Sequence, residues 1–180
     1  MASMSQLTMA MVTLYSGDPK RVQHFMKVYA FAKMIAEEEQ IGSKQREIIE
    51  AAALVHDIGI HAAEKKYHSA AGEYQELEGP PIARAMLMAL EFSPAVTNRV
   101  CELVAHHHSY DTIDDVDLQI LVEADFILNS YEDFLPKRRT ACPSANQGVH
   151  SIFILCWKHA GLNSPKNKKR RCRKFHRQIL

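Results

Sequence analysis

The dipeptide His56-Asp57 combines two side chains that commonly bind divalent metal ions, and it lies within an apolar segment. That segment is Ala51-Ala52-Ala53-Leu54-Val55-His56-Asp57-Ile58-Gly59. We expect so apolar a segment to be buried, where an unpaired carboxylate costs on the order of several kcal/mol. A divalent metal bound to both side chains would offset this cost, and so would a hydrogen-bonded His–Asp pair at a helix end near the surface. The dipeptide alone favours neither interpretation.

Further His and Asp side chains on inward helix faces distinguish these interpretations. At helical spacing, His24 shares a face with the apolar residues Val28, Phe31 and Ile35. Asp125 likewise shares a face with apolar residues of the segment 118–128. Four inward groups on three helices can converge in the core of a bundle, where they are hard to satisfy without a cation. The set therefore predicts a divalent metal site formed by His24, His56, Asp57 and Asp125.

Capping signals and apolar periodicity predict the helices that must position these residues. Asp18-Pro19 and Ser93-Pro94 each pair an N-cap residue with a proline at the first helical position. Helices are expected over residues 4–15, 19–41, 43–59, 80–90, 94–104 and 118–134, with a loop over 61–79 that contains at most one helical turn. No segment alternates as a strand does. The prediction is an all-α fold, a bundle of about six helices with the metal site in its core.

The order His24, then His56-Asp57, then Asp125 resembles the HD-domain superfamily of metal-dependent phosphohydrolases. The context is similar too, because His-Asp-Ile-Gly follows an apolar helix and Val122-Glu123-Ala124-Asp125 lies inside a late helix. The resemblance covers residues 20–135. It implies that these four residues bind a divalent metal ion, for which Mn, Fe, Zn, Ni, Co and Mg all remain open.

Some members of that superfamily hold two metals, using an added histidine between the His-Asp pair and a later His-His pair. In this sequence His106-His107 could supply the later pair. Glu78 stands near the place where the intermediate histidine is expected. Either Glu78 substitutes as a ligand or a single metal suffices.

The resemblance implies hydrolysis of a nucleotide or another small phosphate ester by a metal-activated water. A divalent metal lowers the pKa of a bound water and polarises a phosphoryl oxygen. The candidate catalytic residues, which would orient the water or protonate the leaving oxygen, are Asp57, His106 and His107. The polar segment after the His-Asp pair supplies the candidates for substrate binding, which are His61, Lys65, Lys66 and Glu78. For His106-His107 a polar helix end, and for the lysines a solvated charge pair, are the plainer interpretations.

Two other functions are compatible with the same residues. The first is a non-catalytic metal-binding HD module that senses a nucleotide. The second is an oxidative di-iron enzyme, which the apparent lack of the intermediate histidine makes the weaker alternative. Turnover of a nucleotide panel with Mn²⁺ or Mg²⁺ would separate all three.

Charge divides the chain into two parts of different composition. Residues 1–136 hold 10 Lys and Arg against 21 Asp and Glu, whereas residues 137–180 hold 12 Lys and Arg and no acidic residue. We therefore predict an HD domain over 1–136 and a basic C-terminal tail over 137–180. The tail could bind nucleic acid or be an ill-ordered extension, but we favour a third hypothesis, a reading frame that shifts near Pro136.

Composition also restricts the cellular setting and the partners. No window approaches the roughly 18 apolar residues of a membrane span. Four cysteines without a C-x-x-C pair suggest free thiols in a reducing cytosol, so we expect a cytoplasmic protein that does not associate with membranes. The expected partner is a small phosphorylated substrate, most simply a nucleotide. Nucleic acid is not expected as a partner, and a homodimer is left open.

Overall fold

Seven helices make up the described part of the chain, which in this computed structural model is residues 3–110, 113 and 115–132. They are α1 (Met4–Leu14), α2 (Pro19–Glu38), α3 (Ser43–Val55), α4 (Ile60–Tyr67), α5 (Gly72–Ala89), α6 (Pro94–Val104) and α7 (Val116–Glu132). No strand occurs among these residues, so the all-α prediction is confirmed. The expected boundary at residue 136 and the basic tail lie outside the described residues. No helix in the described ranges combines the length and apolar character that a membrane span requires.

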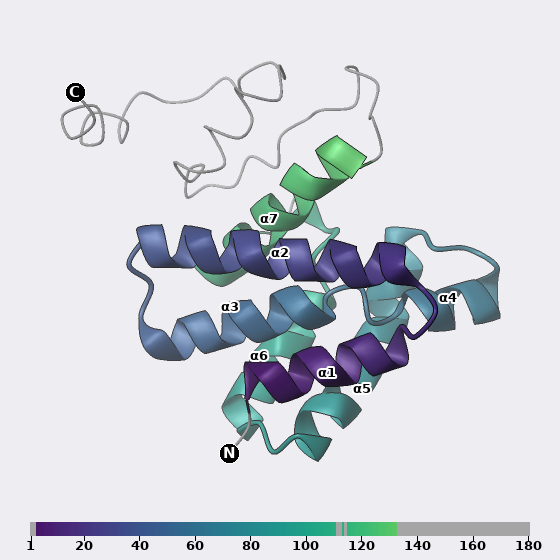
Figure 1. Cartoon of the computed structure of the whole chain (residues 1–180), viewed down its shortest axis with the longest axis horizontal. Coiled ribbons are helices and arrows are strands. Elements are labelled where there is room, and N and C mark those ends of the chain that lie inside the picture. The colour runs from purple at the N-terminus through teal and green to yellow at the C-terminus, as the bar shows by residue number, and fades with distance from the viewer. Residues whose placement is uncertain (1–2, 111–112, 114, 133–180) are drawn as a thin grey trace.

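Helix α3 is the central element of the bundle (Figure 1). It packs against α1, α2, α6 and α7, and α2 also packs against α7. The three consecutive alanines Ala51, Ala52 and Ala53 are buried in α3. Because their side chains are small, the neighbouring helices can approach the α3 backbone closely. This arrangement brings side chains of α2 and α7 to the C-terminal end of α3, where His56 and Asp57 lie.

The expected loop over 61–79 is wrong, because most of it is helical in α4 and α5. Pro80 and Pro81, which were expected to begin a helix, lie inside α5 although each removes one backbone N–H donor. The segment of α5 just before these prolines lies in close backbone contact with Gly59. A Cβ atom on Gly59 would lie 2.7 Å from both the Gln75 carbonyl oxygen and the Gly79 nitrogen. The corner between α3 and α4 thus rests directly on the first half of α5, and we attribute the longer helix to this packing.

The beginning of α7 is fixed by a bidentate ion pair with α6. Arg99 donates from Nε to Asp117 Oδ2 at 2.9 Å and from a terminal nitrogen to Oδ1 at 2.7 Å. Asp117 is 2% exposed, so this pair is shielded from water on the carboxylate side. The clamp holds the first turn of α7 against α6, and Asp125 follows two turns later on the same helix.

Candidate metal centre

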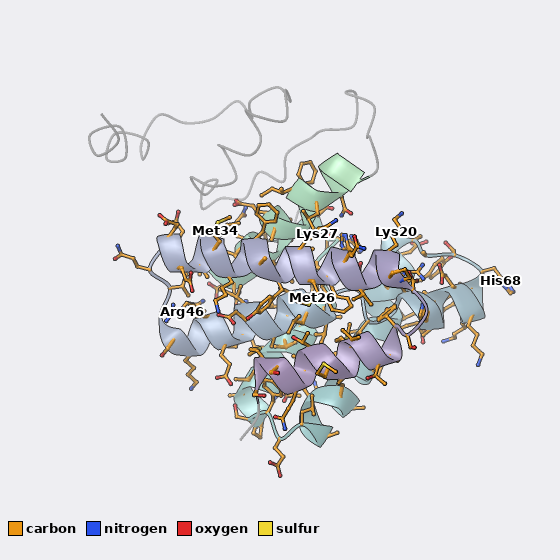
Figure 2. All side chains as sticks on the ribbon, viewed as in Figure 1. Lys20, Met26, Lys27, Met34, Arg46 and His68 are labelled. Atoms are coloured by element: carbon orange, nitrogen blue, oxygen red, sulfur yellow. The ribbon has the colours of Figure 1, made fainter. Side chains whose placement is uncertain are left out.

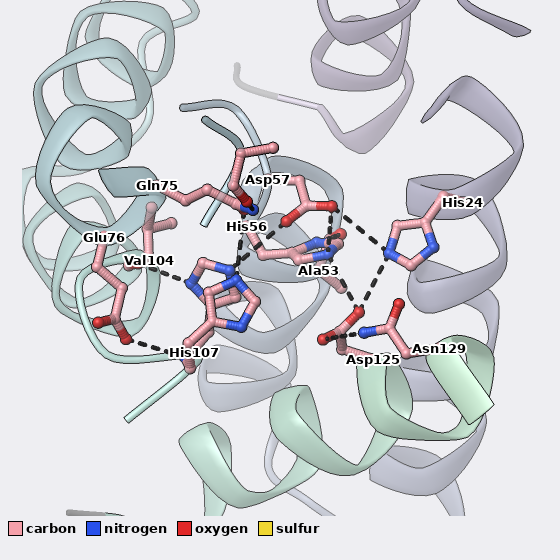
Figure 3. Close-up of polar contacts among 12 residues, drawn as sticks. His24, Ala53, His56, Asp57, Gln75, Glu76, Val104, His107, Asp125 and Asn129 are labelled. Carbon is pink, nitrogen blue, oxygen red and sulfur yellow. Dashed lines mark hydrogen bonds and ion pairs between the residues drawn. The ribbon is translucent and has the colours of Figure 1, made fainter. Parts of the chain in front are cut away.

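Five His and Asp side chains from four places in the fold converge at the C-terminal end of α3 (Figure 3). His24 comes from α2, His56 and Asp57 from the turn after α3, His107 from the turn after α6, and Asp125 from α7. Four of these residues are buried, whereas the Asp57 side chain keeps 18% of its surface exposed. We call these five residues the His/Asp cluster. Asp57 is therefore the most exposed member of the cluster.

The four predicted metal ligands lie together in this cluster and form what we call the first donor group. His24 Nε2 lies 3.1 Å from Asp125 Oδ1 and 3.5 Å from Asp57 Oδ2. His56 Nε2 lies 3.4 Å from Asp57 Oδ2 and 3.6 Å from Asp125 Oδ1. Two imidazole nitrogens and two carboxylate oxygens thus face one another, which is a donor set that many divalent metals accept.

A second donor group shares Asp57 with the first and consists of Asp57, His107 and His108. His107 Nε2 lies 3.6 Å from Asp57 Oδ1, and the rings of His107 and His108 are 4.0 Å apart at their centroids. Asp57 therefore divides its carboxylate, with Oδ2 directed to the first group and Oδ1 to the second (Figure 3). The two histidines beside Asp57 in this group are His107 and His108, whereas the sequence suggested His106 and His107 as the later pair.

Two imidazoles of the cluster are oriented by backbone carbonyls. His56 Nδ1 lies 2.9 Å from the Ala53 oxygen, and His107 Nδ1 lies 2.8 Å from the Val104 oxygen. A carbonyl can only accept, so Nδ1 carries the hydrogen and Nε2 points into the cluster. Both Nε2 atoms are buried without a hydrogen-bond partner. Carbonyl-oriented histidines with an inward nitrogen are typical of metal ligands, so these residues fit a divalent metal ion.

Opposite charges dominate the pKa values of the first donor group. Burial alone would lower the pKa of His56, but the Asp57 charge and the contact with Asp125 raise it well above its usual range. The pKa of His24 is raised for the same reason, chiefly by its bond with Asp125 against the effect of burial. Burial alone would raise the pKa of Asp57, but the charge of His56 and the contact with His107 hold it well below its usual range. Protons and a metal ion therefore compete for the same imidazole nitrogens.

The other histidine candidates lie outside the two donor groups. His106 is exposed, and its Nδ1 lies 2.8 Å from the Glu102 carbonyl oxygen. His61 lies in the first turn of α4, with its ring 4.4 Å from that of Tyr15 and its Nε2 3.6 Å from an oxygen of Asp18. Neither is among the groups that could hold a metal in the described residues.

The candidates for phosphate binding lie along α4 and α5. Lys66 donates to Glu78 at 2.7 Å, and the Tyr67 hydroxyl donates to the same oxygen at 2.8 Å. Glu78 is therefore engaged by α4 and is not a member of either donor group. Lys65 is exposed in the last turn of α4, three residues before His68, which lies at the outer edge of the molecule (Figure 2).

Several residues that contact the two donor groups were not among the predicted site residues. Gln75 Oε1 lies 3.4 Å from His108 Nε2, while its amide nitrogen donates to the Ala70 oxygen at 2.7 Å. Glu76 accepts from the His108 backbone N–H at 2.9 Å. Asn129 donates to Asp125 Oδ2 at 2.8 Å. Asn129 could have been predicted to contact Asp125, because it lies four residues later on the same helix. The contacts of Gln75 and Glu76 could not be predicted without knowing that α5 begins at Gly72.

The fold and the cluster define a helical domain with a core site suited to a divalent metal. The family model of the HD domain matches residues 21–130, a span that includes both donor groups. The chain therefore belongs to the HD-domain family, which is typical of metal-dependent phosphohydrolases. Comparison with curated proteins and with solved structures gave no significant match.

Proposed function

We propose that this protein is a metal-dependent phosphohydrolase acting on a nucleotide or another small phosphate ester. The observation that carries the proposal is the buried pair of Nε2 atoms, on His56 and His107, that face carboxylates without a hydrogen-bond partner. A protein core rarely leaves such atoms unpaired, because each costs about 1–3 kcal/mol. A divalent ion offsets that cost and at the same time equips the site for hydrolysis.

The first donor group, His24, His56, Asp57 and Asp125, would hold the ion. When bound, such an ion supplies a more acidic water and polarises a phosphoryl oxygen. The partly exposed Asp57 carboxylate then orients the water, because Oδ1 is directed away from the first group. His107, whose Nε2 faces Asp57 Oδ1, takes up or gives back a proton at that nitrogen.

Membership of the HD-domain family supports phosphate esters as the substrate class. In this proposal a cationic side chain of α4 neutralises the phosphate. Lys66 already pairs with Glu78, so Lys65 is the stronger of the two lysine candidates. His61 is 42% exposed at the start of α4 and closer along the chain to Asp57 than either lysine. We propose that it contacts the outer part of the substrate.

The test is turnover by the full chain loaded with Mn²⁺ or Mg²⁺. A panel of nucleoside mono-, di- and triphosphates, cyclic nucleotides and one generic phosphate ester is scored for released phosphate or pyrophosphate. We expect hydrolysis by the wild type, loss in His56→Ala, and retention in Glu102→Gln, which removes a carboxylate from an exposed pair with Arg99 on α6.

Failure would take recognisable forms. Metal binding without turnover, together with stabilisation by a nucleotide, would favour the sensing module. Oxygen consumption by the Fe²⁺-loaded chain without phosphate release would favour an oxidative enzyme. A wild-type chain that binds no divalent ion would refute the proposed function altogether.

A further inference from the structure

Tyr15, which follows α1, contacts the metal centre from outside the matched family region. The match begins at residue 21, and Tyr15 lies six residues before it. Its hydroxyl donates to the Asp57 carbonyl oxygen at 2.8 Å, across 42 residues of sequence. Tyr15 is 1% exposed, so this hydrogen bond is protected from water. Tyr15 is thus hydrogen-bonded to the backbone of Asp57, whose carboxylate both donor groups share.

The Asp57 carbonyl accepts two hydrogen bonds, and together they fix its orientation. One comes from Tyr15, and the other comes from the Ile60 backbone N–H at 3.0 Å. A carbonyl oxygen has two lone pairs, so this pair of donors uses both. The peptide unit after Asp57 therefore cannot rotate without breaking a bond. This pair of bonds therefore holds the backbone, and with it the Cβ atom from which the Asp57 carboxylate extends, in one place.

The Tyr15 ring is held from two sides. Its centroid lies 4.4 Å from that of His61 in α4 and 6.2 Å from that of Phe25, the neighbour of His24 in α2. Burial, followed by the nearby Asp57 charge, raises the pKa of the Tyr15 phenol above its usual range. The hydroxyl consequently carries its proton near neutral pH and acts as the donor of its bond to Asp57.

The turn that carries Tyr15 is itself tied to α4. Arg21 donates to Asp18 at 2.7 Å and to Glu64 at 2.6 Å, so the first turn of α2 is bridged to α4. Asp18 also accepts the Arg21 backbone N–H as the N-cap of α2. Residues 15–21 therefore hold α1, α2 and α4 in a fixed relation around Asp57.

We propose that Tyr15 is a positioning residue for the metal centre, which aligns the shared Asp57 carboxylate with both donor groups through the Asp57 backbone. The inference rests on the proposed function only in requiring that a divalent ion binds. According to this inference, the segment that carries Tyr15 contributes to the metal centre although it lies outside the HD-domain match.

The test compares Tyr15→Phe with Tyr29→Phe in the full chain. Tyr29 donates its hydroxyl to Glu50 at 3.0 Å between α2 and α3, away from both donor groups, so each variant loses one hydroxyl and one hydrogen bond. The dissociation constant for Mn²⁺ or Zn²⁺ is measured by competition with a chelator, and unfolding of the metal-free chains is measured in parallel. We expect the constant to rise about 10-fold in Tyr15→Phe, as for other residues that orient metal ligands, and to stay near the wild-type value in Tyr29→Phe.

A second readout reports on the geometry of the site. The visible spectrum of the Co²⁺-loaded chain should change in Tyr15→Phe and not in Tyr29→Phe, because only the first variant frees the Asp57 peptide. A purely structural tyrosine would lower the thermal midpoint without changing the metal constant or the spectrum, and that result overturns the inference. Equal losses of metal affinity in both variants overturn it too. A wild type without metal affinity refutes the proposed function instead, so the two failures are distinguishable.

If Tyr15→Phe does not fold, a chain with an unnatural tyrosine analogue at position 15 provides the test instead. 3-Fluorotyrosine at position 15 keeps the ring and the hydroxyl and changes only the strength of the hydroxyl as a donor. A shifted Co²⁺ spectrum or an altered metal constant supports the inference. Values identical to those of the wild type overturn it.

Discussion

Replacement of Asp57 by asparagine tests the metal centre most directly, because Asp57 supplies an oxygen to both donor groups. Asp57→Asn removes one of the two carboxylates of the first group and the only carboxylate of the second. We expect metal affinity to fall at least about 100-fold, beyond the usual effect of losing an orienting residue. At a metal concentration about 100 times the wild-type dissociation constant, bound metal would stabilise the wild-type fold by about 2.7 kcal/mol and the Asp57→Asn fold by about 0.4 kcal/mol.

Thermal unfolding with and without metal measures this change. For a domain of this size, metal should raise the midpoint of thermal unfolding by about 10 °C in the wild-type chain. In the Asp57→Asn chain it should raise the midpoint by only about one or two degrees. The gain is the quantity to compare, and not the midpoint itself. The depressed pKa of Asp57 means that its ionised form stabilises the metal-free fold above the unfolded-state pKa, so the variant begins from a lower midpoint near pH 7.

The matched control is Glu102→Gln, which makes the same chemical change in an exposed ion pair with Arg99. Surface pairs of this kind contribute about 0–1 kcal/mol, so its midpoint and its metal-dependent gain should both stay close to those of the wild type. Elemental analysis of the purified chains gives an independent count of bound metal. If Asp57→Asn keeps the wild-type metal content and thermal gain, the cluster is not the metal site.

Three further predictions concern pH, packing and phosphate binding. Apparent metal affinity should rise with pH and keep rising above 6.5, the usual pKa of histidine, because the metal must displace protons from imidazoles whose pKa is raised; a flat profile in chelator competition would contradict the reasoning. Gly59→Ala should destabilise the fold by roughly 1–3 kcal/mol, since its Cβ would meet backbone atoms at 2.7 Å, whereas Gly42→Ala, with nothing within 4 Å, should be nearly neutral in urea unfolding. Lys65→Ala should raise KM more than Lys66→Ala, because Lys66 is held by Glu78; the reverse order in steady-state kinetics would contradict this.

The first donor group was predictable because its information is local. Periodicity places His24 and Asp125 on apolar faces, and a buried His56-Asp57 pair needs charged or metallic partners wherever it lies. Convergence then follows from bundle packing. The all-α class followed in the same way, from caps and from the absence of alternating segments.

The α5 segment shows where local signals failed. Pro80-Pro81 resembles a helix start, yet the contact of Gly59 with Gly79 accompanies a helix that begins eight residues earlier. That contact joins residues 20 positions apart, and nothing in either local sequence reports it. Gln75 was missed as a consequence, since its place beside His108 depends on where α5 begins.

Tyr15 was missed for a different reason. It is the last residue of the helix expected over 4–15, and in the structure it is the buried C-cap of α1. What gives it significance is a hydroxyl bond to a backbone carbonyl 42 residues away. A backbone acceptor has no residue type, so no pattern of side chains in the sequence could have indicated this partner.

The bond between His24 and Asp125 spans 101 residues and has a consequence for the order of events during folding. Contacts of such sequence separation form late, because the loop that they close must first be ordered. The complete first donor group therefore cannot exist in a nascent chain until α7 has been synthesised and has docked on α2. Under the proposed function, binding of a metal by all four residues would therefore come at the end of domain assembly. A tightly bound ion would accordingly slow unfolding of the finished domain more than it speeds folding.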